Sequence, residues 1–520
     1  MTLKIKSIPY VLILSVSLMV CSCSLNESPT SQIEEEKIFT SGEALYQHAV
    51  ASLYGYVGGN SDGQGLQGTC RGVYDLQTFG SDEAIIPTRG VDWFDSGMWQ
   101  QLYFHNWSAG HEVIKNSWLY LYKVIALCNR SLETLEKYKY LLSGFEYDRY
   151  AAEVHSLRAI YYWYLLDLFG NVPIVTQTDV SMNEVTQNTR LDVFEFVRDE
   201  LTKNMPYLVN QFSGSVGVNY GRVTQAVACF VLAKLYLNAE VYGAAPAYDE
   251  ALRYCEMIGE MNYQLEEDYI NCFAVNNEGS VENIWIIPMD RVLYTNLQQN
   301  MIRSMHWRHA DACGYLGENG SSATLTVLRV NHFEEPDEDK RFSRNYWGRM
   351  AFDYNSRLVS DRNGENLRYY PWEIKYDMKG SEHLETAGAR MFKYELDRNS
   401  NGKGTLVDND IVLFRYADVL LMQAEAKVRL GQSGQAELDR IRERAKMPSR
   451  PATLDNIYDE RLIELAWEGW RRNDMIRFGR YQSEALPNAR VDESDGHTCL
   501  FPIPQYALDT NPNLKQNPGY

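Results

Sequence analysis

Apolar residues recur at every third or fourth position over long stretches of the chain, a pattern that predicts amphipathic helices. Residues 153–169 are the clearest case, because Gly170 and Pro173 also mark the end of the helix. The apolar face of this helix consists of Val154, Leu157, Tyr161, Tyr164, Leu165 and Leu168. The same pattern predicts further helices over residues 41–56, 115–137, 191–208, 224–241, 248–257, 413–430, 434–444 and 457–478.

Many of the predicted helices form pairs with short links, which is typical of stacked hairpins of the tetratricopeptide kind. No fixed period relates the pairs, so such repeats are degenerate. Residues 260–410 are rich in Asn, Gly, Tyr and Asp and contain few long periodic runs. They predict an irregular lobe with short strands, such as residues 283–287, inserted within the helical scaffold. The Pro- and Asn-rich tail, residues 501–520, should run extended over the surface.

The chain has 520 residues, and 45% of them are hydrophobic, which is ample for a large core. Length alone suggests roughly two to four domains, but no linker divides the chain, so one large domain or two interleaved lobes also fit. The net charge of -19 argues against nucleic acid as a partner, because a basic surface supplies most of that affinity.

The N-terminus predicts a lipoprotein signal peptide over residues 1–22. Lys4 and Lys6 precede an apolar run, residues 10–20, that is too short for a comfortable membrane span. The following letters, VCSC, resemble a bacterial lipobox, and we place cleavage before Cys23 because Ser22 is small. Residues 23–32 would then be a lipidated tether, with acyl chains on Cys23 that hold the protein to a membrane. The alternative is a plain signal peptide with incidental cysteines.

Seven cysteines follow Cys23, and they are odd in number, scattered and never in a CxxC pair. This distribution argues against a zinc site or a disulfide-stapled scaffold, although one or two disulfides remain open. Cys128 and Cys229 lie in helical patterns, and we expect them to be buried as small hydrophobic residues.

An aromatic-rich segment with loop-forming glycines covers residues 87–107, PTRGVDWFDSGMWQQLYFHNW. It combines Trp93, Trp99 and Trp107 with hydrogen-bonding side chains such as Arg89 and Asp92. Such a combination suits either a core or a surface that binds sugars, which stack their CH faces on rings and bond their hydroxyls to polar groups.

Two carboxylates, Glu464 and Glu468, lie one helical turn apart with Arg461, Arg471 and Arg472 in reach. Paired carboxylates can hydrolyse glycosides, but ion pairs on a helix and between helices explain this pattern better. The chain has no identifiable acid/base pair, so we expect a protein without catalytic activity.

Two patterns allow metal binding in principle. His306, His309 and Asp311 could share one helical face, but no obvious second half of a site accompanies them. Residues 397–408 resemble an EF-hand loop, with Gly404 in place of an aliphatic residue and Asp in place of Glu at position twelve. Its oxygen ligands would come from Asp397, Asn399, Asn401 and Asp408. We expect no cofactor, with calcium in this loop as the alternative.

Six segments, in order along the chain, together resemble the SusD/RagB family of outer-membrane lipoproteins. The first is the lipobox with its tether. The others read SLRAIYYWYLLDLFGNVPIVT (156–176), GRVTQAVACFVLAKLYLNA (221–239), LFRYADVLLMQAEAKVRLG (413–431), IYDERLIELAWEGWRRNDMIRFGRY (457–481) and FPIPQYALDTNPNLKQNPGY (501–520).

The resemblance implies an all-α scaffold with degenerate tetratricopeptide-like helix pairs plus a loop-rich irregular lobe. Residues 33–520 would form one domain, with the scaffold at about 33–260 and 410–500. The ligand lobe would be about 260–410 together with the 60–107 loop. Such proteins are lipid-anchored on the outer membrane, face the cell exterior, bind a glycan and cover a SusC-like TonB-dependent transporter. They carry out no catalysis.

The resemblance also selects the residues that would bind the ligand. We expect stacking by Trp93, Trp99 and Trp307, with Tyr294 behind them, while Trp107 packs beneath; Tyr315 is a further candidate by position. We expect hydrogen bonds from Asp82, Arg89, Asp92 and Asn106. We expect Trp118, Trp163, Trp467 and Trp470 to pack in the scaffold.

Three alternatives to glycan capture remain. The same fold could bind a peptide or another nutrient, the scaffold could bind only protein, or the chain could be a glycoside hydrolase. The sequence does not identify the glycan, because linkage is recognised through the angles and spacing of rings.

Overall fold

The computed structural model describes residues 35–59, 63–210, 214, 216–293, 298–482, 492 and 494–520. The predicted signal peptide, the tether and Cys23 lie outside the described residues. Within the described part of the chain, no helix is both long and apolar enough to span a membrane.

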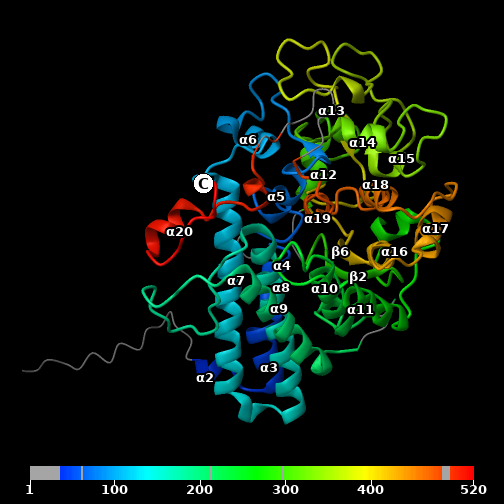
Figure 1. Ribbon diagram of the computed structural model, residues 1–520. Coiled ribbons are helices and arrows are strands. Elements are labelled where there is room, and N and C mark those ends of the chain that lie inside the picture. Colours follow the sequence, from blue (N-terminus) through cyan, green and yellow to red (C-terminus); the bar gives the residue numbers. More distant parts are fainter. Residues whose placement is uncertain are drawn as a thin grey trace, which may run out of the picture.

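Two helices of 26 residues, α7 (Glu112–Lys137) and α8 (Gly144–Phe169), form the long hairpin that dominates one side of the molecule in Figure 1. Successive helices continue this arrangement: α9 packs on α8, α10 on α11, α11 on α16 and α16 on α17. Their bounds are α9 Arg190–Asn204, α10 Gln225–Leu237, α11 Tyr248–Glu260, α16 Tyr416–Arg429 and α17 Gln435–Arg444. The scaffold is thus a series of packed helical pairs, as the apolar periodicity predicts.

The sequence specifies the ends of the α8 and α9 helices. Ser143 and Glu146 form a capping box at the start of α8, and Thr189 and Asp192 form one at the start of α9. Gly170 ends α8 with a φ of 73°, a conformation that disfavours side chains with a Cβ atom. The helix begins at Gly144, well before the expected residue 153. The sequence pattern missed its first turns because they are solvated and show no apolar stripe.

Two predicted C-terminal helices need correction. Residues 411–415 form strand β6 (Ile411–Arg415), and α16 starts only at Tyr416. The stretch 457–478 is not one helix but two, α18 (Leu454–Glu464) and α19 (Arg471–Arg477). Trp467 has a φ of 62° at the break. Its backbone N–H donates to the buried Glu83 carboxylate, and its carbonyl accepts from the Tyr74 hydroxyl at 3.1 Å. Groups from a distant segment therefore replace the helical hydrogen bonds.

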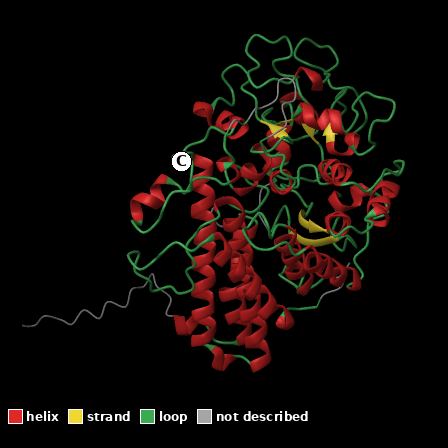
Figure 2. Ribbon diagram, viewed as in Figure 1, coloured by secondary structure: helices red, strands yellow, loops and turns green. Residues whose placement is uncertain are grey.

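The irregular lobe contains short elements joined by loops, which Figure 2 shows in green around the upper half of the molecule. The predicted strand at residues 283–287 is confirmed as β2 (Asn283–Ile287), which pairs antiparallel with β6. Two smaller antiparallel pairs join β1 (Ala84–Ile85) to β3 (Ser322–Ala323) and β4 (Tyr346–Trp347) to β5 (Arg390–Met391). The remaining helices are α2 Glu35–Ile38, α3 Gly42–Tyr46, α4 Ser52–Val57, α5 Val73–Phe79, α6 Met98–Phe104, α12 Gln299–Ser304, α13 Trp307–Ala312, α14 Leu325–Val330, α15 Phe342–Asn345 and α20 Gln505–Thr510.

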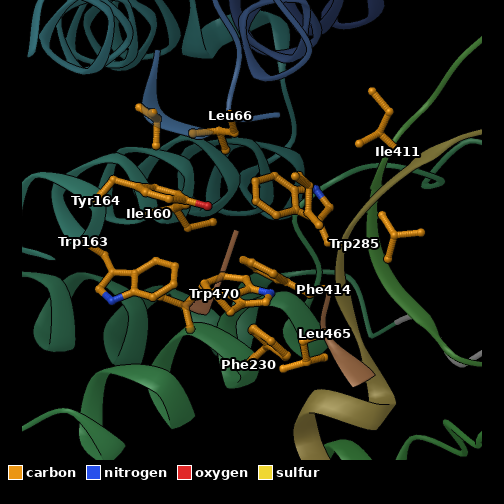
Figure 3. Packing of buried hydrophobic residues seen from close by; sticks show 14 of the residues in the cluster. Leu66, Ile160, Trp163, Tyr164, Phe230, Trp285, Ile411, Phe414, Leu465 and Trp470 are labelled. Carbon is orange, nitrogen blue, oxygen red and sulfur yellow. The ribbon is translucent and has the colours of Figure 1, made fainter. Parts of the chain in front are cut away.

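Aromatic rings from distant segments join the scaffold to β2 and β6 in the core, as Figure 3 shows. Phe414 stacks on Phe230 with ring centres 4.2 Å apart, and Trp470 stacks on Trp163 at 6.0 Å. The expected packing roles of Trp118, Trp163, Trp467 and Trp470 are confirmed, because all four rings are buried. Cys128 and Cys229 are also buried, and all seven described cysteines are free thiols.

The expectation of ion pairs at Glu464 and Glu468 is confirmed, although most of the partners come from other elements. Arg415 of β6 bonds both carboxylates, at 2.6 and 2.8 Å, and also Glu282 at 2.8 Å. Arg461, Arg471 and Arg472 instead pair with carboxylates elsewhere in the fold. The Arg415 cluster is fully buried, so Glu464 and Glu468 are structural groups without access to a substrate.

Candidate functional site

The aromatic-rich segment divides between core and surface. Trp107 packs beneath, as expected: it is 4% exposed and donates from Nε1 to the Tyr520 hydroxyl at 2.7 Å. Trp99 is 2% exposed and donates to Asp95 at 2.8 Å, with Phe79 against its ring. The predicted stacking role does not fit Trp99, because its ring has no free face for a ligand.

Trp93 lies at the surface end of this segment and is partly exposed. Its backbone has a φ of 61°, a left-handed conformation that residues with a bulky side chain rarely adopt. The indole donates to the Glu318 carbonyl at 2.9 Å, and its ring lies directly against Gly320, where a Cβ atom would come within 2.6 Å. These contacts fix the ring on the irregular lobe. Phe94, the next residue, is 51% exposed.

Trp307 begins α13 and is 38% exposed. The preceding residue, His306, caps the helix by accepting from the Arg308 backbone N–H at 3.2 Å. A Cβ atom at Gly317 would lie 3.0 Å from the His306 carbonyl oxygen. The segment 317–320 therefore contacts both Trp93 and the start of α13. We call the exposed or partly exposed rings of Trp93, Phe94 and Trp307 the aromatic rim.

Polar groups accompany the aromatic rim. Glu385 forms an ion pair with Arg362 at 3.2 Å, its carboxylate lies 3.9 Å from His306 Nε2, and its backbone carbonyl accepts from Asn319 at 3.0 Å. Burial lowers the pKa of His306 to about 3, with nearby cations acting in the same direction, so its imidazole is neutral at physiological pH. Burial also raises the pKa of Glu318. The rim thus has both acceptors and donors beside flat rings, the combination that sugar recognition requires.

Two of the predicted hydrogen-bonding residues have structural partners instead. Arg89 is 3% exposed and donates to the backbone carbonyls of Leu384 and Ala387 at 2.8 and 2.9 Å. It therefore supports the loop that carries Glu385 and does not face a ligand. Asp82 forms a two-point ion pair with Arg471 of α19, at 2.6 and 3.0 Å. This pair joins the segment before β1 to the C-terminal helices.

The other predicted residues have separate outcomes. Asp92 and Asn106 are exposed and stay candidates for binding. Tyr294 lies outside the described residues. Tyr315 is 3% exposed, and its hydroxyl donates to the Asp397 carbonyl and accepts from the Asp397 backbone N–H. The proposed role as a stacking ring does not fit Tyr315.

The EF-hand-like loop has a different geometry from a calcium site. The Asp397 carboxylate accepts from the backbone N–H groups of Asn399 and Asp408, and the Asp408 carboxylate pairs with Arg291. Asn401 pairs with Leu406 in a short hairpin. The carboxylates of Asp397 and Asp408 are therefore already bonded by backbone amides and by Arg291.

The His306 and His309 pattern also has other partners. His309 is fully buried, with Nδ1 3.0 Å from the Tyr369 hydroxyl and Nε2 3.1 Å from the Phe352 carbonyl oxygen. Both ring nitrogens are thus engaged by protein groups, whereas Asp311 is exposed.

An apolar groove lies apart from the aromatic rim. It has a volume of about 600 Å³ and runs between α7, the segment 173–185 and α20. Leu119, Met182 and Tyr506 line it and are 40%, 50% and 55% exposed. Exposed apolar surface of this kind is typical of protein contacts.

The sequence did not single out Phe94, Glu318 or Glu385. Phe94 is adjacent to Trp93, and its ring was visible in the segment. The two carboxylates carry no local signal, because Glu318 and Glu385 join the rim only through contacts between segments distant in the chain.

Comparisons with known proteins give a consistent result. The sequence profile of the SusD family matches residues 255–520, and a profile described as starch-binding and associating with the outer membrane matches residues 77–237. The starch-binding protein SusD of Bacteroides thetaiotaomicron is 25% identical over 98% of this chain and 97% of that protein. The SusD-like protein P25 of Formosa agariphila is 24% identical over 100% of both chains.

Solved structures share the fold. A laminarin-binding SusD-like protein superposes with a TM-score of 0.72 and 20% identity, over 92% of this chain and 100% of that one. The surface glycan-binding protein A of Bacteroides thetaiotaomicron, in complex with laminarihexaose, superposes with a TM-score of 0.71 and 20% identity, over 92% of this chain and 100% of that one. The predicted fold class, a helical scaffold with a loop-rich lobe, is confirmed.

Proposed function

The chain belongs to the SusD family, and on this premise we propose that it captures oligosaccharide or polysaccharide at the aromatic rim. The observation that carries the proposal is the rim itself. Phe94 and Trp307 are exposed and Trp93 is partly exposed, with the polar groups of Glu318 and Glu385 nearby. Relatives whose names record binding of starch or laminarin support the same ligand class.

Affinity electrophoresis through a panel of neutral polysaccharides tests this proposal. The protein should be retarded by at least one glycan, and Trp307→Ala should weaken binding about 2- to 12-fold, because ring stacking contributes roughly 0.5–1.5 kcal/mol. Tyr140→Ala removes a 73% exposed ring at the far end of the helical hairpin and should bind normally. A folded protein that no glycan retards would refute glycan capture.

We extend the proposal to location: acyl chains on Cys23 hold the protein on the outer membrane, with the rim facing the cell exterior. Labelling cells with a radioactive fatty acid tests the anchor, since Cys23→Ser should lose the label and Cys21→Ser should keep it. Protease added to intact cells should digest the wild-type protein. Equal labelling of both variants would exclude Cys23 as the anchor.

We also propose that the captured glycan passes to a SusC-like TonB-dependent transporter. The apolar groove of α7 and α20 supports this part, because its exposed side chains suit a protein partner better than a sugar. Leu119→Asp should reduce co-purification of the transporter, whereas Leu430→Asp, at a 38% exposed position outside the groove, should not. Unchanged co-purification would exclude the groove as the contact.

No hydrolysis is part of the proposal. The closely spaced carboxylates Glu464 and Glu468 are buried in ion pairs with Arg415. Incubation with a retarding glycan should therefore release no new reducing ends. Release of reducing ends would favour the hydrolase alternative, and retardation by peptide but not by glycan would favour peptide capture.

A further inference from the structure

A cavity that shares no lining residue with the aromatic rim or the apolar groove lies between the irregular lobe and the end of α17. It has a volume of about 520 Å³ and is lined by three segments, residues 267–271, 340–344 and 444–446. This volume is within the usual range of small-molecule sites, about 300–1,000 Å³. We call it the charged pocket.

Three cations that line the charged pocket have no acidic partner among the described residues. Lys340, Arg344 and Lys446 line it and are exposed. Lys340 donates to the Lys446 backbone carbonyl at 2.8 Å, which brings the two lysine positions together.

Two other cations that line the pocket already have acidic partners. Arg341 pairs with Asp339, Glu460 and Glu464, and Arg444 pairs with Glu282 and Glu464. Because these two guanidinium groups already have acidic partners, Lys340, Arg344 and Lys446 are the cations available to a ligand.

Two acidic side chains also line the pocket. Glu267 and Asp268 are exposed, and neither forms an ion pair within the described part of the chain. The Asp268 side chain accepts from the Ile270 backbone N–H at 3.3 Å, which orients its carboxylate. A simple anion would be repelled by these two groups, whereas a ligand with both a carboxylate and hydroxyls could bind the cations and the carboxylates of the pocket together.

We propose that the charged pocket binds an acidic sugar, a uronic acid unit of a polysaccharide. Lys340, Arg344 and Lys446 hold the sugar carboxylate through charge-assisted hydrogen bonds, and Glu267 and Asp268 accept from its hydroxyls. The inference rests on the proposed glycan capture and adds a ligand class and a second point of attachment to it.

Affinity electrophoresis with three polyuronates, polygalacturonate, alginate and glucuronan, tests the inference. At least one should retard the wild-type protein, and the double variant Arg344→Gln/Lys446→Gln should bind it about 10-fold or more weakly. Retardation should also fall as salt rises from 0.05 to about 0.5 M, because the ion pairs are screened. Arg440→Gln is the control, since it removes an exposed cation of α17 that does not line the pocket.

The outcomes separate this inference from glycan capture as a whole. Retardation by a neutral glycan that depends on Trp307, together with polyuronate binding that the double variant leaves unchanged, would overturn the charged pocket alone. The absence of retardation by all three polyuronates would also overturn it. So would inorganic sulfate that reduces the retardation by polyuronate as strongly as free galacturonate does. Equal melting temperatures for wild type and double variant would show that lost binding is not lost folding.

Discussion

At the residue scale, the environment of each ring and carboxylate decides its role. Trp93 and Trp99 are six residues apart and have equal stacking capacity, yet only Trp93 is partly exposed. The difference comes from the left-handed backbone at Trp93 and its contact with Gly320. A local sequence pattern could not distinguish the two rings, because the deciding contact joins positions more than 200 residues apart.

Glu83 is a buried carboxyl group whose ionisation should limit stability. One oxygen accepts from the Trp467 backbone N–H, while Oε2 has no hydrogen-bond partner among the described residues. Burial raises its pKa to about 7, against the lowering effects of Trp467, Lys393 and Arg471. The unfolded chain should have an ordinary value of about 4.3.

The folded protein therefore holds this proton more tightly than the unfolded chain, and the free energy of unfolding should fall as pH rises from about 4 to 7. Glu83→Gln removes this loss. The free energy of unfolding of Glu83→Gln minus that of the wild type should therefore rise by on the order of 2 kcal/mol between pH 5 and pH 8. Urea denaturation at both pH values measures it, and a difference that stays constant with pH would contradict the prediction.

At the element scale, the sequence predicted helices well where one apolar stripe faces the core. The predicted helices at 191–208 and 248–257 correspond to α9 and α11 with ends that differ by a few residues. Helix breaks were predicted poorly, because the interruption at Trp467 depends on Glu83 and Tyr74 from another segment. The apolar pattern continues across that break and gives no sign of it.

Thr189 should contribute measurably to the stability of α9. Its hydroxyl accepts from the Asp192 backbone N–H at 3.2 Å, and Asp192 accepts in return from the Thr189 N–H at 2.9 Å. Thr189→Ala should lower the free energy of unfolding by about 1 kcal/mol. Thr202→Ala is a matched control on the same helix, because that hydroxyl bonds only the carbonyl of Arg198. Equal urea midpoints for the two variants would mean that the capping box contributes nothing.

At the scale of the whole molecule, buried charges join the irregular lobe to the C-terminal helices. Arg415 of β6 links Glu282 beside β2 to Glu464 and Glu468, and Lys393 of the lobe bonds Glu468 at 2.6 Å. Burial raises the pKa of Glu464, but the charges of Arg444, Arg415 and Arg341 outweigh it and hold the pKa well below its usual range. The network therefore stabilises the fold above about pH 4 and loses this contribution as pH falls further.

Arg415→Met tests whether this network makes lobe and scaffold unfold together. The substitution keeps the volume but leaves three buried carboxylates short of a cation, so the free energy of unfolding should fall by about 3–5 kcal/mol. Because the rings packed around Phe414 also join β6 to the scaffold, circular dichroism of the scaffold and tryptophan fluorescence should still report one coincident transition in urea. Arg253→Met, which breaks an exposed pair with Glu250 inside α11, should cost no more than about 1 kcal/mol. Two separated transitions in Arg415→Met would contradict this expectation and show that the lobe and the scaffold are coupled mainly through Arg415. A loss of unfolding free energy as small as that of Arg253→Met would show that apolar packing around Phe414 and Trp470 couples the two regions without Arg415.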